Sequence, residues 1–234
     1  MPNYSYNIVL TGSSSGIGNS LGNYLSKKGY NVIGLSRRNN IKNNFKSIIC
    51  DVRDLNRLKK GLNKIKKVDC LINNAGIARS KHKDKIKNFE EIIKTNLYGA
   101  YYMSHLLKKK LSKSSKASII NIGSIAAHQG GVDNPGYVSS KSGIVGLTKA
   151  LANDYYSANI RVNSISPGYF KSPMTEKSYK SKKRKKNISS RLIINRWGEA
   201  KDLFGLVEYL MSEKASYVTG QDFVIDGGWL AKGL

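Results

Sequence analysis

The sequence predicts an α/β fold in which a parallel sheet is covered by helices on both faces. Short apolar runs typical of buried strands alternate with amphipathic, helix-like segments from the start of the chain to its end. A chain of 234 residues fits one ordinary domain, and neither an internal repeat nor a linker interrupts the alternation. We therefore expect a single domain over residues 1–234.

The first half of the chain alternates between short strands and helices. The expected strands are runs rich in Ile, Val, Leu or Cys, at residues 6–10, 31–35, 47–50 and 68–72. Helices are expected at residues 17–28 and 55–66. Gly29 follows the first of these helices directly, in the position where glycine commonly ends a helix, so this boundary is well marked.

The second half continues the same alternation with longer helices. A long amphipathic helix is expected over residues 89–110, followed by a strand over residues 117–122 and a helix over residues 137–156. A strand over residues 160–165, a helix over residues 200–211 and a short strand over residues 223–225 complete the order. Because helices connect the strands, the strands are expected to run parallel.

Composition bears on the partners of the chain. The net charge is +25 at pH 7 and the isoelectric point is near 10.0, values that are also found in nucleic-acid-binding proteins. The lysines, however, are spread over most of the expected helices and accompany many Asn, Ile and Tyr residues, a mixture that codon bias in an AT-rich genome produces by itself. We therefore favour codon bias over nucleic-acid binding.

Neither a membrane span nor a secretory signal is expected. No apolar stretch reaches the roughly 18 residues that a spanning helix requires, and residues 1–6 lack the basic flank and the apolar core of a secretory signal. Cys50 and Cys70 lie in or beside short apolar runs without a second Cys or His at the spacing of metal ligands. We expect a cytoplasmic protein with reduced core thiols and no bound metal.

The turn between the first expected strand and the first expected helix is rich in glycine and serine. Glycine allows the positive φ angles of a tight turn and lets a pyrophosphate approach the backbone, while the helix behind it offers unpaired N–H groups. The spacing differs from Gly-x-Gly-x-x-Gly, but the position after the first strand supports the same function. The residues expected to bind phosphate are Gly12, Ser14, Ser15, Gly16, Ile17 and Gly18.

The end of the second strand, Ser36-Arg37-Arg38, predicts which dinucleotide is bound. An acidic residue there would bind both ribose hydroxyls of NAD and repel a 2′-phosphate, whereas arginine accommodates that phosphate. We therefore expect NADP(H) in preference to NAD(H); the alternative is that Arg37 and Arg38 are only surface charge. Contacts to the adenosine are expected from the ends of the next two strands, at Asp51, Val52, Asn73, Ala75 and Gly76.

A tyrosine and a lysine four residues apart follow the strand expected over residues 117–122. Ser124 stands just after this strand, and a turn rich in Gly and Pro leads to Tyr137 and Lys141. If Tyr137 opens a helix, Lys141 lies one turn further on the same face. A cation there lowers the pKa of the tyrosine from its ordinary value of about 10. This predicts a general acid/base, although Tyr-x-x-x-Lys alone also occurs at ordinary helix starts.

Several short motifs occur in one order along nearly the whole chain. They are Gly12 to Gly18, Asn73-Asn74-Ala75-Gly76, Asn96, Ser124, Tyr137, Lys141, Pro167-Gly168, Thr219 to Asp222 and Asp226-Gly227-Gly228. In this order they resemble the short-chain dehydrogenase/reductase family. The resemblance implies a Rossmann-type, doubly wound sheet of seven parallel strands, a nicotinamide cofactor, and assembly as a homodimer or homotetramer.

The resemblance also implies roles for individual residues. Tyr137 would exchange a proton with the substrate oxygen, Ser124 would hold that oxygen, and Lys141 would bind the nicotinamide ribose. Asn96 would position a water molecule that relays protons past the lysine. The residues that would contact the nicotinamide are Pro167, Gly168 and Ser172. Of the three histidines, only His128 is close enough in sequence to Ser124 to border the substrate pocket.

The segment over residues 171–196, where the family usually places a mobile substrate lid, is strongly basic. The cations on which this interpretation rests are Lys177, Lys180, Lys182, Lys183, Arg184, Lys185, Lys186, Arg191 and Arg196. They favour a negatively charged substrate, such as a sugar acid, a nucleotide-linked sugar or an acyl group on an acidic acyl carrier protein. The alternative is a solvated basic loop.

The expected activity is the NADP(H)-dependent interconversion of a carbonyl and a secondary alcohol. The resemblance is to 3-oxoacyl-acyl-carrier-protein reductases and to gluconate-type sugar dehydrogenases, with the chain ending favouring the sugar-type enzymes. A different function is a non-catalytic Rossmann module that binds NADP and RNA or senses the cofactor. The complete Asn-Ser-Tyr-Lys group speaks against this alternative, because a sensor has no evident use for an acid/base tyrosine.

Overall fold

A computed structural model of the chain describes residues 6–39, 42–131 and 134–232. Their strands form a seven-stranded sheet with the order β3-β2-β1-β4-β5-β6-β7, in which all neighbouring strands are parallel. The strands are β1 (Asn7–Thr11), β2 (Asn31–Ser36), β3 (Lys46–Ile49), β4 (Cys70–Asn73), β5 (Ser118–Ile122), β6 (Arg161–Pro167) and β7 (Asp222–Ile225). This confirms the predicted doubly wound, Rossmann-type sheet.

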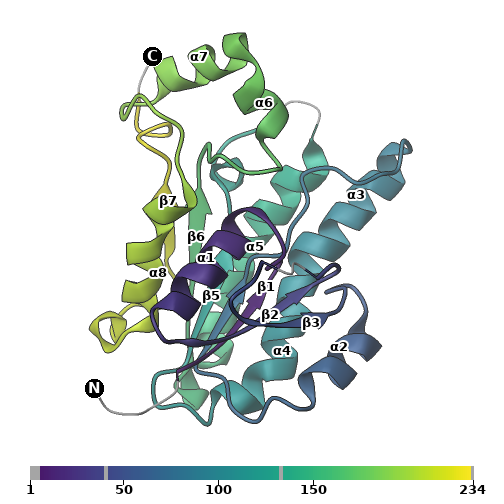
Figure 1. The fold of residues 1–234 in the computed structure, drawn as a ribbon, viewed down its shortest axis with the longest axis vertical. Helices are drawn as coiled ribbons and strands as arrows, with labels where there is room; N and C mark the ends of the chain where they lie inside the picture. Colours follow the sequence, from purple (N-terminus) through teal and green to yellow (C-terminus); the bar gives the residue numbers. More distant parts are fainter. Residues whose placement is uncertain (1–5, 40–41, 132–133, 233–234) are drawn as a thin grey trace.

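Helices cover both faces of the sheet, as predicted (Figure 1). The α-helices are α1 (Gly16–Lys27), α2 (Leu55–Leu62), α3 (Lys85–Ile93), α4 (Gly99–Leu111), α5 (Pro135–Asp154), α6 (Glu176–Lys180), α7 (Lys182–Arg191) and α8 (Phe204–Met211). Gly29 has a φ of 91° just after α1, so the expected helix end is confirmed. Within the described residues, no helix is both long and apolar enough to cross a membrane.

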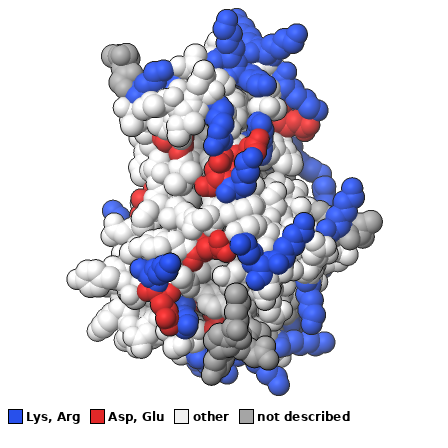
Figure 2. All heavy atoms as spheres, turned by 60° about the vertical axis from the view of Figure 1, so that its left-hand side comes forward, with Lys and Arg blue, Asp and Glu red and all other residues white. Residues whose placement is uncertain are grey.

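The basic segment after β6 is folded into two short helices, α6 and α7, where no helix was expected. Ser181 caps α7, because its hydroxyl accepts a hydrogen bond from the main-chain N–H of Arg184 at 3.4 Å. Figure 1 shows these helices at one end of the molecule, apart from the helices that cover the sheet. Figure 2 shows Lys and Arg side chains gathered at that end.

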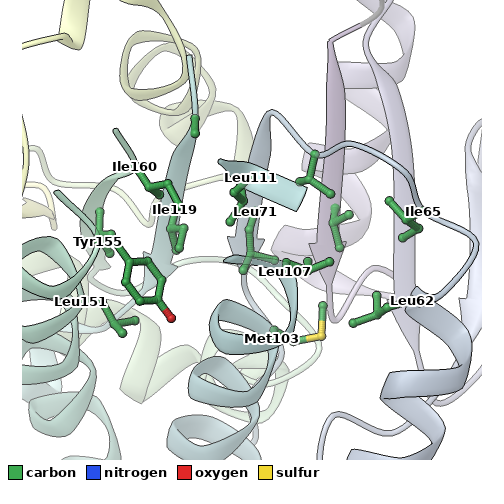
Figure 3. Packing of buried hydrophobic residues seen from close by; sticks show 14 of the residues in the cluster. Leu62, Ile65, Leu71, Met103, Leu107, Leu111, Ile119, Leu151, Tyr155 and Ile160 are labelled. Carbon is green, nitrogen blue, oxygen red and sulfur yellow. The ribbon is translucent and has the colours of Figure 1, made fainter. Parts of the chain in front are cut away.

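The core forms two apolar layers, one on each face of the sheet. Successive residues of β1 point to opposite layers: Ile8 and Leu10 pack with α1 and α8, whereas Val9 packs with α2, α4 and α5. Figure 3 shows the second layer, with Leu62, Ile65, Leu71, Met103, Leu107, Leu111, Ile119, Leu151, Tyr155 and Ile160. Because both faces are buried, the strands read as apolar runs rather than as alternating patterns.

Some predicted boundaries were wrong. The helix expected over residues 89–110 begins at Lys85, because the carboxylate of Asp84 caps it by accepting from the N–H of Lys87 at 2.7 Å. A π-helical turn, Lys94–Tyr98, then separates α3 from α4. The expected helix over residues 55–66 ends at Leu62. Cys50 and Cys70 are buried and free, as predicted.

Candidate active site

A cavity at the carboxyl ends of the strands brings together most of the residues predicted from the sequence. This position is where ligands bind in open parallel sheets. The predicted residues that line it are Gly12, Ser14, Ser15, Gly16, Ile17, Arg37, Arg38, Asp51, Val52, Ala75, Gly76, Ser124, Tyr137, Lys141, Pro167, Gly168 and Ser172. The exceptions are Gly18, Asn73 and Asn96, which lie outside the cavity lining.

The glycine-rich turn has the geometry that a phosphate group requires. Gly12 and Gly16 have φ angles of 67° and 58°, which side-chain-bearing residues rarely adopt. A Cβ on Gly12 would lie 2.8 Å from the Cα of Ala75, so the turn also needs glycine for its close approach to the segment that follows β4. The turn leads into the N-terminus of α1. The first residues of this helix, Gly16 and Ile17, line the cavity, so the unpaired N–H groups of the first helical turn lie beside it. These residues fit a dinucleotide pyrophosphate.

Gly18 belongs to the packing of this turn rather than to the cavity surface. A Cβ on Gly18 would lie 2.3 Å from Nδ2 of Asn74 and 2.5 Å from the carbonyl oxygen of Gly12. The third glycine of such turns serves close packing of the helix against the strand. The prediction that Gly18 contacts the cofactor directly is therefore replaced by a supporting role.

Asn73 was wrongly assigned to the cofactor surface. Its side chain is buried in the helix layer, where Nδ2 donates to Oδ1 of Asn121 at 2.9 Å and to the hydroxyl of Ser104 at 3.1 Å. The next residue, Asn74, lines the cavity and donates from Nδ2 to the carbonyl oxygen of Thr11 at 3.0 Å. Successive side chains along a strand point to opposite faces of the sheet, so the side chains of these two asparagines point to different sides.

The two arginines after β2 are exposed and line the cavity. The hydroxyl of Ser36 donates to the carbonyl oxygen of Arg38 at 2.6 Å and so holds this corner. After the neighbouring strand β3, Nε and Nη2 of Arg53 donate to the carboxylate of Asp51 at 3.0 Å and 2.7 Å. Burial acts to raise the pKa of Asp51, but the hydrogen bonds from Arg53 outweigh it and hold this pKa below its ordinary value.

Ser124, Tyr137 and Lys141 line the same cavity. The strand β5 ends beside this cavity, and the helix α5 begins beside it. Ser124 precedes a short 3₁₀ helix, and its hydroxyl accepts from the N–H of Ala126 at 3.1 Å. Tyr137 stands in the first turn of α5, and Lys141 follows one turn later, as predicted. The ammonium nitrogen of Lys141 lies 5.8 Å from the centre of the Tyr137 ring.

The expected lowering of the Tyr137 pKa is not found in this structure. Burial raises the pKa of Tyr137, and a hydrogen bond with Ser124 opposes this only in part. Burial also lowers the pKa of Lys141 to about 8. The low-dielectric environment disfavours both charged forms, so desolvation outweighs the effect that the lysine was expected to have on the phenol.

Asn96 lies in the π-helical turn and joins three elements around the cavity. Its Oδ1 accepts from the N–H of Ile77 at 2.8 Å, and its Nδ2 donates to the Ile77 carbonyl oxygen and to the hydroxyl of Ser140, both at 3.0 Å. The side chain is therefore fully engaged in holding the loop after β4 against α5. Thr95, which the sequence reasoning missed, lines the cavity, and its buried hydroxyl has no hydrogen-bond partner among the described residues.

His128 faces the last strand and lies outside the cavity lining. Its Nε2 is 2.7 Å from Oδ2 of Asp222, whose carboxylate also accepts hydrogen bonds from the hydroxyls of Ser164 and Ser166. The hypothesis that His128 borders the substrate is therefore replaced by a structural contact between β7 and the loop after Ser124.

The fold and the cavity together are those of the dinucleotide-binding class of proteins built on a doubly wound sheet. A family model described as "Enoyl-(Acyl carrier protein) reductase" matches residues 12–230. The chain belongs to the short-chain dehydrogenase/reductase family, because this match and the relatives below cover nearly all of it.

Two named relatives represent the two kinds of enzyme that the sequence resembles. The 2-dehydro-3-deoxy-D-gluconate 5-dehydrogenase of Dickeya dadantii (strain 3937) is 32% identical over 96% of this chain and 95% of its own length. The 3-oxoacyl-[acyl-carrier-protein] reductase of Haemophilus influenzae is 33% identical over 94% of this chain and 96% of its own length.

Solved structures share the fold over nearly the whole chain. The aldohexose dehydrogenase of Thermoplasma acidophilum has a TM-score of 0.90 at 27% identity and covers 98% of this chain and 95% of its own. A putative 2-deoxy-D-gluconate 3-dehydrogenase from Agrobacterium tumefaciens with bound NADP has a TM-score of 0.87 at 29% identity, covering 98% of each chain. A 4-hydroxyisoleucine dehydrogenase complexed with NADH has a TM-score of 0.89 at 33% identity, covering 97% of this chain and 100% of its own.

Proposed function

We propose that the chain is an NADP(H)-dependent enzyme that interconverts a carbonyl and a secondary alcohol, with Tyr137 as the general acid/base. The observation that carries the proposal is that Tyr137, Ser124 and Lys141 line the same cavity as the glycine-rich turn. A phosphate-binding turn alone would suit any dinucleotide-binding protein. A phenol and a hydroxyl beside it supply the groups that carbonyl chemistry requires.

The proposed chemistry follows from the charge that develops on the substrate oxygen. The nicotinamide, when bound, supplies or accepts a hydride. In the direction of reduction, the hydroxyl of Ser124 donates a hydrogen bond to the carbonyl oxygen, and the phenol of Tyr137 transfers its proton to that oxygen. The raised pKa of Tyr137 keeps the phenol protonated at neutral pH, which suits a proton donor. In the direction of oxidation, the same two groups act in reverse.

Lys141 and Asn96 support this proton transfer in two different ways. Lys141 is buried and close to the Tyr137 ring, so its positive charge stabilises a phenolate as the proton leaves. It is also the residue that would hold the nicotinamide ribose. Asn96 holds the π-helical turn against α5, and we assign to this turn the binding of the water molecule that returns a proton.

The preference for NADP(H) is supported by the corner after β2. Arg37 and Arg38 line the cavity at the strand end where an acidic residue would select NAD, and Ser36 occupies the place of that acid. A guanidinium binds a phosphate through charge-assisted hydrogen bonds, which a ribose hydroxyl cannot match in strength. These residues would hold the 2′-phosphate.

An anionic substrate is supported by the lid and by the relatives. The lid helix α7 carries a run of lysines and arginines, and Met174 and Thr175 at the start of the lid line the active-site cavity. The named relatives act on a sugar acid and on a 3-oxoacyl thioester carried by a protein. We propose a substrate of one of these two kinds, with a sugar-nucleotide derivative as a further member of the sugar class.

We also propose that the chain assembles as a homodimer or homotetramer. Tyr98 ends the π-helical turn and Tyr101 lies three residues later in the first turn of α4, and they are 46% and 45% exposed. The ring of Tyr101 stacks on His105, 6.0 Å away, so aromatic surface continues along this helix. Exposed aromatic surface of this kind favours a protein partner, and a second copy of the chain is the partner that we propose.

A substrate screen tests the proposed function. NADPH oxidation and NADP⁺ reduction are measured with aldonic and keto-aldonic acids, their neutral sugars and 3-oxoacyl thioesters. Turnover of at least one carbonyl or alcohol class is expected. RNA retention at physiological salt without turnover of any compound would instead support a non-catalytic binding protein.

A further inference from the structure

A second cavity adjoins the active site beneath the lid helix α7. Its lining includes Tyr169 and Trp229, together with Arg184 and Arg191 from α7. Tyr169 lies between Gly168 and Phe170, which both line the active-site cavity. One continuous segment, residues 168–170, therefore contributes to the linings of both cavities.

The aromatic floor of this second cavity is anchored to the catalytic loop. The indole N–H of Trp229 donates to Oε1 of Gln129 at 2.9 Å, and Gln129 belongs to the loop that joins Ser124 to Tyr137. The ring of Tyr169 meets that of Trp229 edge-on, with 4.6 Å between the ring centres. The guanidinium carbon of Arg191 lies 4.4 Å from the centre of the Trp229 ring. Lid, floor and catalytic loop are thus held together.

Some cations of the lid region already have a carboxylate partner, whereas the two arginines of this cavity, like the lysines of α7, have none within the described part of the chain. Lys171 and Lys201 share the carboxylate of Glu199, and Arg196 pairs with Asp202. By contrast, among the described residues no carboxylate forms an ion pair with either arginine of the second cavity. Two guanidinium groups in one cavity therefore lack a counterion from the described chain.

Two observations indicate that Arg184 and Arg191 form a single binding site: their spacing along α7 and the effect of their charges on Tyr169. Arg184 and Arg191 are seven residues apart on α7, which places them two turns apart on one face of the helix. Burial raises the pKa of Tyr169, while Arg191 and Arg184 both act to lower it, so the positive charge of both arginines reaches the hydroxyl on the cavity floor. Figure 2 shows how the charge of this end of the molecule is dominated by cations.

We propose that this cavity is the subsite for the carboxylate of a sugar-acid substrate, with Arg184 and Arg191 as its specificity-determining residues. The proposal rests on the proposed function of the adjoining active site. A planar guanidinium matches a carboxylate through two parallel hydrogen bonds. The rings of Tyr169 and Trp229 offer apolar surface to the carbon skeleton. An acidic carrier protein would instead meet the lysines on the outer side of α7, such as Lys186, which lies outside this cavity lining.

Charge removal at the cavity tests the proposal. The double variant R184Q/R191Q removes both cations, and K186Q is a control within the same helix, because it removes an exposed cation that lies outside the cavity lining. Each is assayed with NADPH and the preferred keto-acid from the substrate screen, in parallel with the methyl ester of that acid. For the acid, kcat/KM should fall by about 10- to 100-fold in the double variant, mainly through KM. The ester and K186Q should change by less than about threefold.

Binding without turnover separates this proposal from the proposed function. Isothermal titration calorimetry uses D-gluconate as the acidic probe and D-glucitol as the neutral one. Gluconate binding that R184Q/R191Q abolishes would support the subsite even if no carbonyl were turned over. Turnover of a keto-acid with unchanged KM and unchanged gluconate binding in the double variant would overturn the subsite and leave the proposed function intact. Equal losses for acid and ester, or a requirement for Lys186 with a carrier-linked substrate, would also overturn it.

Discussion

The ammonium group of Lys141 donates a 2.7 Å hydrogen bond to the main-chain carbonyl oxygen of Ile122. Both residues are buried, and the bond joins α5 to the end of β5 beside the active-site cavity. One hydrogen bond does not replace the hydration of an ammonium group, so burial lowers the pKa of Lys141 to about 8. The buried charge of Lys141 therefore costs folding stability.

Replacing Lys141 by methionine tests this cost. The unfolded chain keeps the lysine proton up to about pH 10.5, whereas the folded protein releases it near pH 8. The unfolded state thus binds more protons between these values, and wild-type stability rises with pH there. The free energy of unfolding of K141M, minus that of wild type, should decrease by about 3 kcal/mol from pH 8 to pH 10.5.

Urea unfolding across this pH range measures the difference. K149M is the control for removing a lysine from the same helix, because Lys149 is exposed on α5. A difference between K141M and wild type that stays constant with pH would contradict the lowered pKa of Lys141.

Arg37 should determine the choice of dinucleotide. Replacing it by alanine removes charge-assisted hydrogen bonds to the 2′-phosphate, which are worth about 1.5–3 kcal/mol, or roughly 10- to 150-fold in Kd. NADPH binding should weaken by this factor, while NADH binding changes by less than about threefold. Fluorescence titration measures both Kd values.

R57A is the control, since Arg57 is exposed and pairs with Asp54 away from the cavity. Equal weakening of NADPH and NADH binding in R37A would rule out the NADP(H) preference.

The exposed Tyr98 and Tyr101, where the π-helical turn meets α4, should hold the proposed assembly together. Charge introduced by Y98E/Y101E would have to be desolvated in an interface, so the double variant should be monomeric. Light scattering of wild type and variant measures the mass. Y217E is the control, because Tyr217 is fully exposed between α8 and β7, the edge strand opposite β3. A monomeric wild type, or an assembly that survives Y98E/Y101E, would exclude this interface.

The parts of the fold that depend on short segments were predictable from the sequence. The strand β1, the glycine-rich turn after it and the helix α1 could each be predicted from neighbouring residues. The same holds for the position of Lys141 one turn after Tyr137. The choice between NAD and NADP also rests on a local feature, the residues at the end of β2. Each of these depends on backbone geometry within one or two turns.

Features that depend on tertiary contacts could not be predicted. Whether Asn73 or Asn74 faces the cavity depends on which side of β4 meets the helix layer, and the sequence pattern of a strand buried on both faces does not record this. The low pKa of Lys141 likewise depends on how deeply α5 packs. The contact between Gln129 and Trp229 joins residues one hundred positions apart.

The helix α7 in the proposed lid was not predicted, for a physical reason. Lys182–Arg191 carries almost no apolar residues, so it lacks the periodicity by which amphipathic helices are recognised. Its helix is favoured instead by the Ser181 cap and by the helix propensity of lysine and arginine. A capping serine before a highly charged run was the signal that could have predicted α7.

Proton transfer by Tyr137 is tested most directly by the rate of hydride transfer in Y137F. The measurement is single-turnover NADPH oxidation with the preferred carbonyl substrate, together with the Kd for NADPH. Y156F is the control, because Tyr156 is 75% exposed after the end of α5. The hydride-transfer rate of Y137F should fall by about 100- to 10,000-fold, with the Kd for NADPH within about threefold of wild type. A Y137F rate within tenfold of wild type would contradict the assignment of Tyr137 as the general acid/base.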